Sequence, residues 1–269
     1  MELEFIRKEK TGDIYKYGED KILKLFKEEV SEDEMMNEYK ALKLANQIDY
    51  LSPKAYEMIT IGEQRGIVIE DIETLSAKQY FLKHISRVRF ISKTFSGIHI
   101  KLHSLESDEL INQVTYFEKE LNKIAVLPED IKEVLIDYMR TLPQGVCLCH
   151  GHFDLTQIMV DKTWQVTDFS YAYQGNPCSD VQKTRLLLLS PNRNKDITFI
   201  QRCLLATCSK WFNRMYLQNY LRQTGYRKKQ IKAWKVIVAA TSLNETIECE
   251  KSWLLSIVFS EMKRLKLKV

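Results

Sequence analysis

The stretch from Cys149 to Asp180 constrains this chain more than any other, because it sets histidines, carboxylates and amides around two short apolar runs. Residues 158–160 (Ile-Met-Val) predict one short strand, and residues 164–167 predict a second. Asp161 and Lys162 lie between them and predict a turn. We therefore expect a small hairpin, which brings the residues before its first strand close to the residue after its second.

The residues that this hairpin brings together carry the chemistry of a phosphate or metal site. Four polar side chains precede the first strand, and we expect them to lie near Asp168, which follows the second; they are His150, His152, Asp154 and Gln157. Mg²⁺ needs only one or two protein oxygens and takes its other ligands from phosphates and water. The cluster therefore suits a polyphosphate with Mg²⁺, which indicates phosphoryl transfer.

In these residues the chain resembles the aminoglycoside phosphotransferase and choline kinase superfamily, small-molecule kinases with a protein-kinase-like fold. The family signature runs His-Gly-Asp, then an Asn or Gln, an apolar strand, a second strand ending in Ile-Asp-Phe or a similar triplet, Gly-Asp-Pro and a further Asp. The matching segments here are His150-Gly151-His152, Gln157, Ile158-Met159-Val160, Thr167-Asp168-Phe169, Gly175-Asn176-Pro177 and Asp180. The resemblance extends more weakly over most of the chain.

The resemblance implies a fold and an activity. The fold is of the α+β class and bilobal, with a small antiparallel β-rich N-terminal lobe containing one helix (residues 1–72) and a larger, mainly helical C-terminal lobe (residues 73–269). The second lobe would hold the catalytic hairpin and the acceptor site. The activity would be transfer of the γ-phosphate of ATP, or of GTP, to a hydroxyl of a small molecule, with Mg²⁺ as the cofactor.

Local patterns agree with this division. Strand patterns occur in the N-terminal part at residues 2–6, 14–17, 21–26 and 66–70. Between them Ser31, with Glu34 three residues on, forms a capping-box pattern that predicts the start of a helix. Helical periodicity dominates the rest of the chain, apart from the hairpin. The aromatic residues that we expect in its core are Trp211, Tyr216, Tyr220, Trp234 and Trp253.

The resemblance also assigns roles within the hairpin segment. Asp168 and Gln157 would be the Mg²⁺ ligands, each through a side-chain oxygen. His150 would brace the loop. Asp180 begins an apolar helix at residues 181–189, so it is expected either to cap that helix or to brace the loop, rather than to take part in catalysis.

The chain departs from the family at the catalytic position. His152 stands where the family has its catalytic Asp, and Asp154 stands where relatives often have His. In another register Asp154 keeps the role of base, but Met159 then falls at the metal position, so we prefer the register that keeps Gln157. Either His152 or Asp154 is the candidate base.

The same departure leaves two functional hypotheses open. Imidazole can accept a hydroxyl proton, and a positioned base contributes only part of the acceleration, roughly 10²–10⁴-fold, so the chain is either an active kinase or a pseudokinase that binds nucleotide without transfer. Asn176 and Ser170 depart from the family too and favour the second hypothesis. A non-enzymatic helical scaffold is a third hypothesis, disfavoured because chance would not give this ordered set of residues.

The N-terminal lobe carries candidate nucleotide-binding residues. On the residues alone, Lys24 reads as a surface lysine of a strand and Glu38 as a solvated helix residue. The resemblance reverses this interpretation, because the family uses a Lys and a Glu in this order to orient phosphates. Main-chain groups of Glu70 and Ile72 would bind the purine at the hinge between the lobes. A strict glycine-rich loop is absent.

Two further pairs remain ambiguous. Glu245 and Glu248 share a helical face and would bind an amine of the acceptor, although a solvated helix surface explains them equally well. His99 and His103 have the spacing of a metal-binding pair. No third ligand is apparent, and relatives have similar histidines in this helix, so we interpret the pair as structural.

Composition bounds the remaining possibilities. The 269 residues have 45% hydrophobic content, enough for a substantial core. The net charge of +4 arises from 40 basic and 36 acidic residues, a mixed surface that does not indicate nucleic-acid binding. Six irregularly spaced cysteines, no leader pattern and no long apolar run predict a reduced cytoplasmic protein without a membrane partner. We expect a monomer or a weak homodimer.

Overall fold

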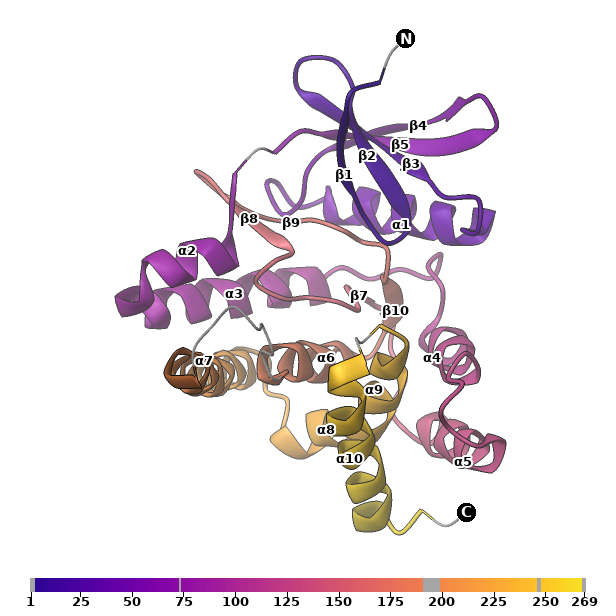
Figure 1. The fold of residues 1–269 in the computed structure, drawn as a ribbon, viewed down its shortest axis with the longest axis vertical. Helices are drawn as coiled ribbons and strands as arrows, with labels where there is room; N and C mark the ends of the chain where they lie inside the picture. Colours follow the sequence, from indigo (N-terminus) through magenta and orange to yellow (C-terminus); the bar gives the residue numbers. More distant parts are fainter. Residues whose placement is uncertain (1–2, 73, 191–198, 246–247, 268–269) are drawn as a thin grey trace.

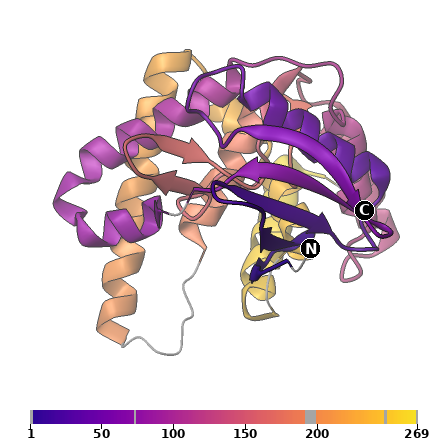
Figure 2. The ribbon, with the colours of Figure 1, turned by 90° about the horizontal axis from the view of Figure 1, so that it is seen from above.

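The computed structural model describes residues 3–72, 74–190, 199–245 and 248–267, except for the side chains of 199–205 and 248–249. Its N-terminal part is a five-stranded antiparallel sheet in the order β1-β2-β3-β5-β4 with one helix, α1 (Figure 1). The bounds are β1 (Phe5–Lys8), β2 (Gly12–Lys16), β3 (Lys21–Phe26), α1 (Glu32–Ala45), β4 (Ala55–Ile61) and β5 (Gln64–Glu70). Seen from above, this sheet lies across the top of the helical part (Figure 2).

The two faces of β3 have different surroundings, as its alternation predicts. Leu23 and Leu25 are buried with Val68 of β5 in a small apolar cluster. Lys24 lies between them in the strand and points to the other face of the sheet, because successive strand residues alternate. That face carries α1, which begins after Ser31 with the predicted capping box.

Two small sheets connect the N-terminal sheet with the helices. The predicted hairpin is confirmed as β8 (Ile158–Val160) and β9 (Trp164–Val166), which pair with the two-residue strand β6 (Leu75–Ser76). A second sheet pairs β7 (Cys147–Cys149) with β10 (Tyr173–Gly175). The segment between β7 and β8 is thereby fixed at both ends.

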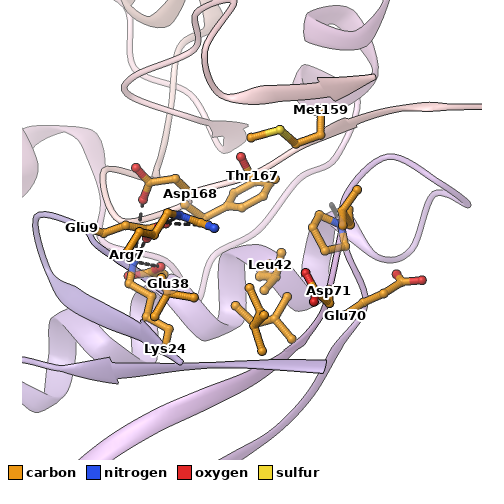
Figure 3. Close-up of a pocket in the computed structure, with 16 residues that line it drawn as sticks. Arg7, Glu9, Lys24, Glu38, Leu42, Glu70, Asp71, Met159, Thr167 and Asp168 are labelled. Atoms are coloured by element: carbon orange, nitrogen blue, oxygen red, sulfur yellow. Dashed lines mark hydrogen bonds and ion pairs between the residues drawn. The ribbon is translucent and has the colours of Figure 1, made fainter. Parts of the chain in front are cut away.

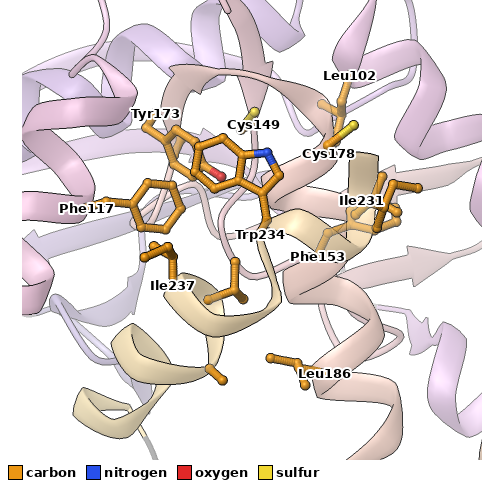
Figure 4. Packing of buried hydrophobic residues seen from close by; sticks show 14 of the residues in the cluster. Leu102, Phe117, Cys149, Phe153, Tyr173, Cys178, Leu186, Ile231, Trp234 and Ile237 are labelled. Atoms are coloured by element: carbon orange, nitrogen blue, oxygen red, sulfur yellow. The ribbon is translucent and has the colours of Figure 1, made fainter. Parts of the chain in front are cut away.

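Helices make up the rest of the described chain. They are α2 (Ala77–Lys83), η1 (Ile85–Arg87), α3 (Val88–His103), α4 (Gln113–Asn122), α5 (Glu129–Arg140), α6 (Pro177–Leu189), α7 (Phe199–Thr224), α8 (Lys228–Ala233), α9 (Lys235–Thr241), η2 (Ser242–Asn244) and α10 (Glu248–Leu265). Trp234 packs at their centre, with its ring 5.6 Å from that of Phe117 (Figure 4). The predicted α+β class, with a β-rich first part and a helical second part, is confirmed.

Some local predictions were wrong. Trp211, expected in the core, is 46% exposed and Trp253 is half-buried, whereas Tyr216, Tyr220 and Trp234 are buried as expected. Strand β4 was missed because it is an edge strand in which all residues but Ala55 are half-exposed or exposed, which blurs its alternation. Within the described residues, no helix has the length and apolarity needed to cross a bilayer.

Candidate active site

A pocket lies between the N-terminal sheet and the β8–β9 hairpin (Figure 3). One end is formed by the segment that follows β5, and the other end is polar. Apolar side chains from both lobes line the walls, among them Ile22 and Met159. The lining residues that sequence reasoning had singled out are Lys24, Glu38, Glu70, Ile72 and Asp168.

Lys24 and Glu38 form a buried ion pair at the polar end. The Lys24 Nζ lies 2.6 Å from the Glu38 Oε1, and the lysine side chain is only 2% exposed. Glu9 and Asp168 follow at 3.4 and 3.7 Å from the same Nζ. Burial by itself lowers the pKa of Lys24, but these three carboxylates outweigh burial and hold the pKa above its ordinary value. Lys24 is therefore a fixed cation.

The carboxylates around Lys24 outnumber it. Burial raises the pKa of Glu38, Lys24 lowers it, and Asp168 and Glu9 raise it again, to about 7. Three carboxylates thus surround one ammonium group at this end of the pocket, where the Arg7 guanidinium pairs with only one of them, Glu9. An additional cation would relieve their mutual repulsion.

Asp168 follows β9 and projects into this end of the pocket. It has a positive φ of 59°, a conformation that the Ser170 hydroxyl supports by donating to the Asp168 Oδ1 over 2.6 Å. Burial alone would raise the pKa of Asp168, but Lys24 and Ser170 lower it below its ordinary value. The carboxylate is therefore ionised at neutral pH.

Gln157 lies next to Asp168, as the hairpin predicted. The Thr167 amide donates to the Gln157 carbonyl over 2.8 Å, which sets Gln157 beside the end of β9. Within the described part of the chain the Gln157 side-chain amide makes no hydrogen bond. A carboxylate and an amide oxygen are ligand types that Mg²⁺ accepts, and of these two residues Asp168 lines the pocket whereas Gln157 does not.

Asp180 holds the loop before β8 from beneath. Its carboxylate accepts the main-chain amides of His150 over 2.6 Å and Gly151 over 3.0 Å. Helix α6 is capped by Asn176, and Asp180 lies in its first turn. Of the two roles expected for Asp180, bracing the loop is therefore the observed one and capping is wrong.

His99 and His103 complete the environment of Asp180. Their Nε2 atoms lie 3.0 and 3.2 Å from its Oδ2, and their Nδ1 atoms accept from the hydroxyls of Tyr216 and Tyr220. Asp180 is thus the third residue of the His99–His103 cluster. Sequence reasoning found no third residue because Asp180 lies 81 positions from His99. The three are spaced as metal ligands would be. Every ring nitrogen already has a protein partner, so the cluster is complete as a hydrogen-bonded brace.

His150 and Gly151 fix the path of the loop itself. His150 Nε2 donates to the Thr167 carbonyl over 3.0 Å, while its Nδ1 accepts the amide of His152 over 3.3 Å. Gly151 has a φ of +76°, and a Cβ there would collide with the Tyr171 carbonyl oxygen. The loop therefore needs glycine at this position.

The two candidate bases have different surroundings. Asp154 folds back onto its own turn, where its Oδ1 accepts the amide and hydroxyl of Thr156 and the amide of Gln157. His152 remains 22% exposed, and its Nδ1 lies 3.1 Å from the Glu245 Oε2. Asp154 is thus held within its own turn, whereas the His152 ring contacts a residue 93 positions away in the chain.

The Glu245 carboxylate, a candidate to bind an amine of the acceptor, is already bound by other side chains of the protein. Its Oε2 also lies 2.7 Å from the Lys183 Nζ, and both side chains are almost fully buried. Burial alone would raise the pKa of Glu245, but Lys183 and His152 lower it to about 2. The side chain of Glu248, proposed to act with it, lies outside the described residues. Lys183 was missed because nothing local distinguishes a lysine in an apolar helix.

Comparisons with known proteins agree with this architecture. No protein-family model matches the chain, and no curated protein matches it by sequence. Among solved structures it is similar to a type VIII aminoglycoside-3'-phosphotransferase (TM-score 0.61, 13% identity, 89% of this chain and 93% of the other). It is also similar to APH(2'')-IIa in a ternary complex with streptomycin and ATP (TM-score 0.56, 18% identity, 98% of this chain and 91% of the other). It is also similar to a choline/ethanolamine kinase family protein from Mesorhizobium loti, with a TM-score of 0.55 and 14% identity over 99% of this chain and 87% of the other.

The chain has the fold of the aminoglycoside phosphotransferases and choline kinases. The segment after β5 leads from the N-terminal sheet to β6 and the helical part, and it lines one end of the pocket. The Glu70 amide is bonded to the Lys54 carbonyl and the Asp71 amide to the Asp20 carbonyl. Among the described residues the Ile72 amide has no such partner, so it can donate to a ligand in the pocket.

The turn between β1 and β2 lies at the polar end of the pocket. It carries Glu9, which binds both Arg7 and Lys24, and Lys10, whose Nζ lies 4.3 Å from the centre of the Tyr171 ring. Charged side chains, rather than glycine amides, therefore cover the polar end of the pocket.

Proposed function

We propose that the protein is an ATP-dependent phosphotransferase that transfers the γ-phosphate to a hydroxyl of a small molecule. The observation that carries this proposal is the buried Lys24–Glu38 pair with Asp168 3.7 Å from the same ammonium. A lysine fixed by a helix glutamate next to a metal-binding aspartate is the arrangement that positions phosphates in kinases. Solved neighbours of this fold are small-molecule phosphotransferases, one of them bound to ATP, which supports the proposal.

Each part of the pocket then has a role. The main chain at Glu70 and Ile72 binds the purine. Lys24 binds the phosphates, which displace the Glu9 carboxylate that lies 3.4 Å from the Lys24 Nζ. Asp168 and Gln157 hold Mg²⁺, which neutralises phosphate charge when bound. The acceptor hydroxyl approaches from the side of His152.

The proposed acceptor site differs from one built to bind amines through Glu245. Because Lys183 already neutralises this carboxylate, Glu245 offers little net charge to a cationic acceptor. We therefore expect neutral hydroxylated compounds to be accepted at least as well as polyamines. A panel of sugars, amino alcohols and aminoglycosides, assayed by ATP-dependent mass gain, tests this expectation.

A pseudokinase is the second candidate function, and His152 at the position of the catalytic aspartate favours it. The deciding experiment compares the wild type with the His152→Asp variant, measuring thermal stabilisation by MgATP and then ADP release with the acceptor panel. Turnover by the wild type supports the phosphotransferase. Turnover by the variant alone identifies a nucleotide-binding pseudokinase, and absence of MgATP binding in both rejects both candidates.

A further inference from the structure

We propose that Glu245 is a positioning residue that fixes the ring of His152 so that its Nε2 serves as the base toward the acceptor hydroxyl. This inference rests on the proposed phosphotransferase function and deepens it, because it assigns the proton-accepting atom. It also explains how the chain replaces the missing aspartate.

The first step of the argument is the charge state of Glu245. Its Oε2 lies 2.7 Å from the Lys183 Nζ, which also donates to the Ser242 hydroxyl over 3.1 Å. Both charged side chains are almost fully buried, with exposed fractions of 7% and 8%. A buried carboxylate this close to an ammonium group is ionised at neutral pH, and it can only accept hydrogen bonds.

The second step is the tautomer of His152. Because the Glu245 Oε2 can only accept, the His152 Nδ1, 3.1 Å away, is the donor in this contact. In a neutral imidazole the other nitrogen then carries the lone pair. Among the described residues no group bonds to the His152 Nε2, and the side chain is 22% exposed. The free acceptor nitrogen is therefore accessible.

The third step is the orientation of the ring. The Tyr171 ring packs against that of His152, with 5.1 Å between their centres. The His152 amide is held by His150, whose own amide is held by Asp180. Main chain and side chain of His152 are thus both fixed, as a base requires.

The chemical step then balances as follows. His152 Nε2 takes the proton of the acceptor hydroxyl while the hydroxyl oxygen forms a bond to the γ-phosphorus. The bond from this phosphorus to the β,γ-bridging oxygen breaks, and ADP leaves with the electron pair. The imidazolium is stabilised by Glu245 and later releases its proton to water. A hydrogen-bonded carboxylate behind an imidazole has this orienting role in hydrolase triads.

The test uses a variant that removes the pair without leaving a buried charge, Lys183→Met with Glu245→Leu. Its matched control is Lys235→Met with Glu261→Leu, which removes another Lys–Glu pair, 3.0 Å apart. In ¹⁵N histidine spectra we expect His152 of the wild type and of the control in the Nδ1–H form. The Nε2–H form should become the major one in the test variant. A wild type in the Nε2–H form, or a test variant that keeps Nδ1–H, overturns the proposal.

Turnover provides the second readout, with MgATP and water as the probe reaction. We expect the test variant to lose at least about tenfold in kcat with the KM for MgATP unchanged, because the base and not nucleotide binding is affected. His152→Ala should lower kcat by the same factor. The protein that combines His152→Ala with Lys183→Met and Glu245→Leu should lose no more kcat than His152→Ala alone. If the loss in kcat of the combined variant is instead the product of the two separate losses, Glu245 does not act through His152 and the proposal is overturned. A wild type that turns over neither water nor any compound of the acceptor panel overturns the proposed function and the base role, while the tautomer spectra still decide the positioning contact.

Discussion

Asp180 and Lys183 lie three residues apart on α6 and hold the loop of His152 from two sides. Asp180 accepts the amides of His150 and Gly151, while Lys183 binds the Glu245 that in turn binds the His152 ring. One turn of one helix therefore sets both the backbone of the loop and the orientation of its exposed side chain.

The Lys183–Glu245 pair should show strong coupling in stability. Lys183→Met or Glu245→Leu alone leaves a buried charge without its partner, which costs about 3–5 kcal/mol of unfolding free energy. The double variant leaves no such charge, so we expect it to cost much less than the sum. Urea unfolding of the four proteins measures the coupling. Additive losses would show that the two side chains do not share a buried environment.

Gly151 should be far less replaceable than Gly18, although both have positive φ. At Gly18, φ +82°, a Cβ meets nothing within 4 Å, so Gly18→Ala should cost only about 1–2 kcal/mol. At Gly151 the same change adds a collision with the Tyr171 carbonyl, and we expect at least about 2 kcal/mol more. Thermal unfolding of both variants measures the difference. Equal losses of stability in the two variants would mean that the loop around Gly151 shifts to accommodate the added Cβ.

Lys24 should be required for nucleotide binding. At a MgATP concentration of 100 Kd, the wild type should gain about 2.7 kcal/mol of stability. Lys24→Met removes the cation that would face the phosphates, so we expect most of this gain to disappear. The control is Lys21→Met, in the same strand, whose Nζ lies over the Tyr56 ring instead. Full stabilisation of the Lys24 variant by MgATP would remove this lysine from the nucleotide site.

The histidine brace should make the protein sensitive to acid. Burial, with His103 close by, lowers the pKa of His99 from 6.5 to about 3. As the pH falls below 6.5 the unfolded chain binds a proton at His99 and the folded chain does not, so stability falls. The slope should approach about 1.4 kcal/mol per pH unit for this group.

Urea unfolding between pH 7 and pH 4 tests this dependence. His99→Gln should have lower stability throughout but a shallower dependence on pH. The control is His84→Gln, at a partly exposed histidine that caps α2, which should keep the slope of the wild type. If His99→Gln has the same slope as the wild type, His99 is not the group responsible.

Much of the fold was accessible to sequence reasoning because its signals are local. The β8–β9 hairpin follows from two apolar runs around a turn, and α1 begins at a capping box formed within four residues. Such features depend on neighbours along the chain. Edge strand β4 and the exposure of Trp211 were missed, since both depend on what covers a surface rather than on a pattern.

The same division holds for the candidate site. The sequence by itself predicted the hairpin that brings Gln157 close to Asp168, and the family resemblance of the residues from His150 to Asp180 singled out Lys24 and Glu38 as a candidate pair. Only the tertiary structure decided that Asp180 joins His99 and His103, and that Lys183 and Glu245 stand behind His152. These contacts join residues 62 to 93 positions apart, so packing of the whole lobe, and not local pattern, brings them together.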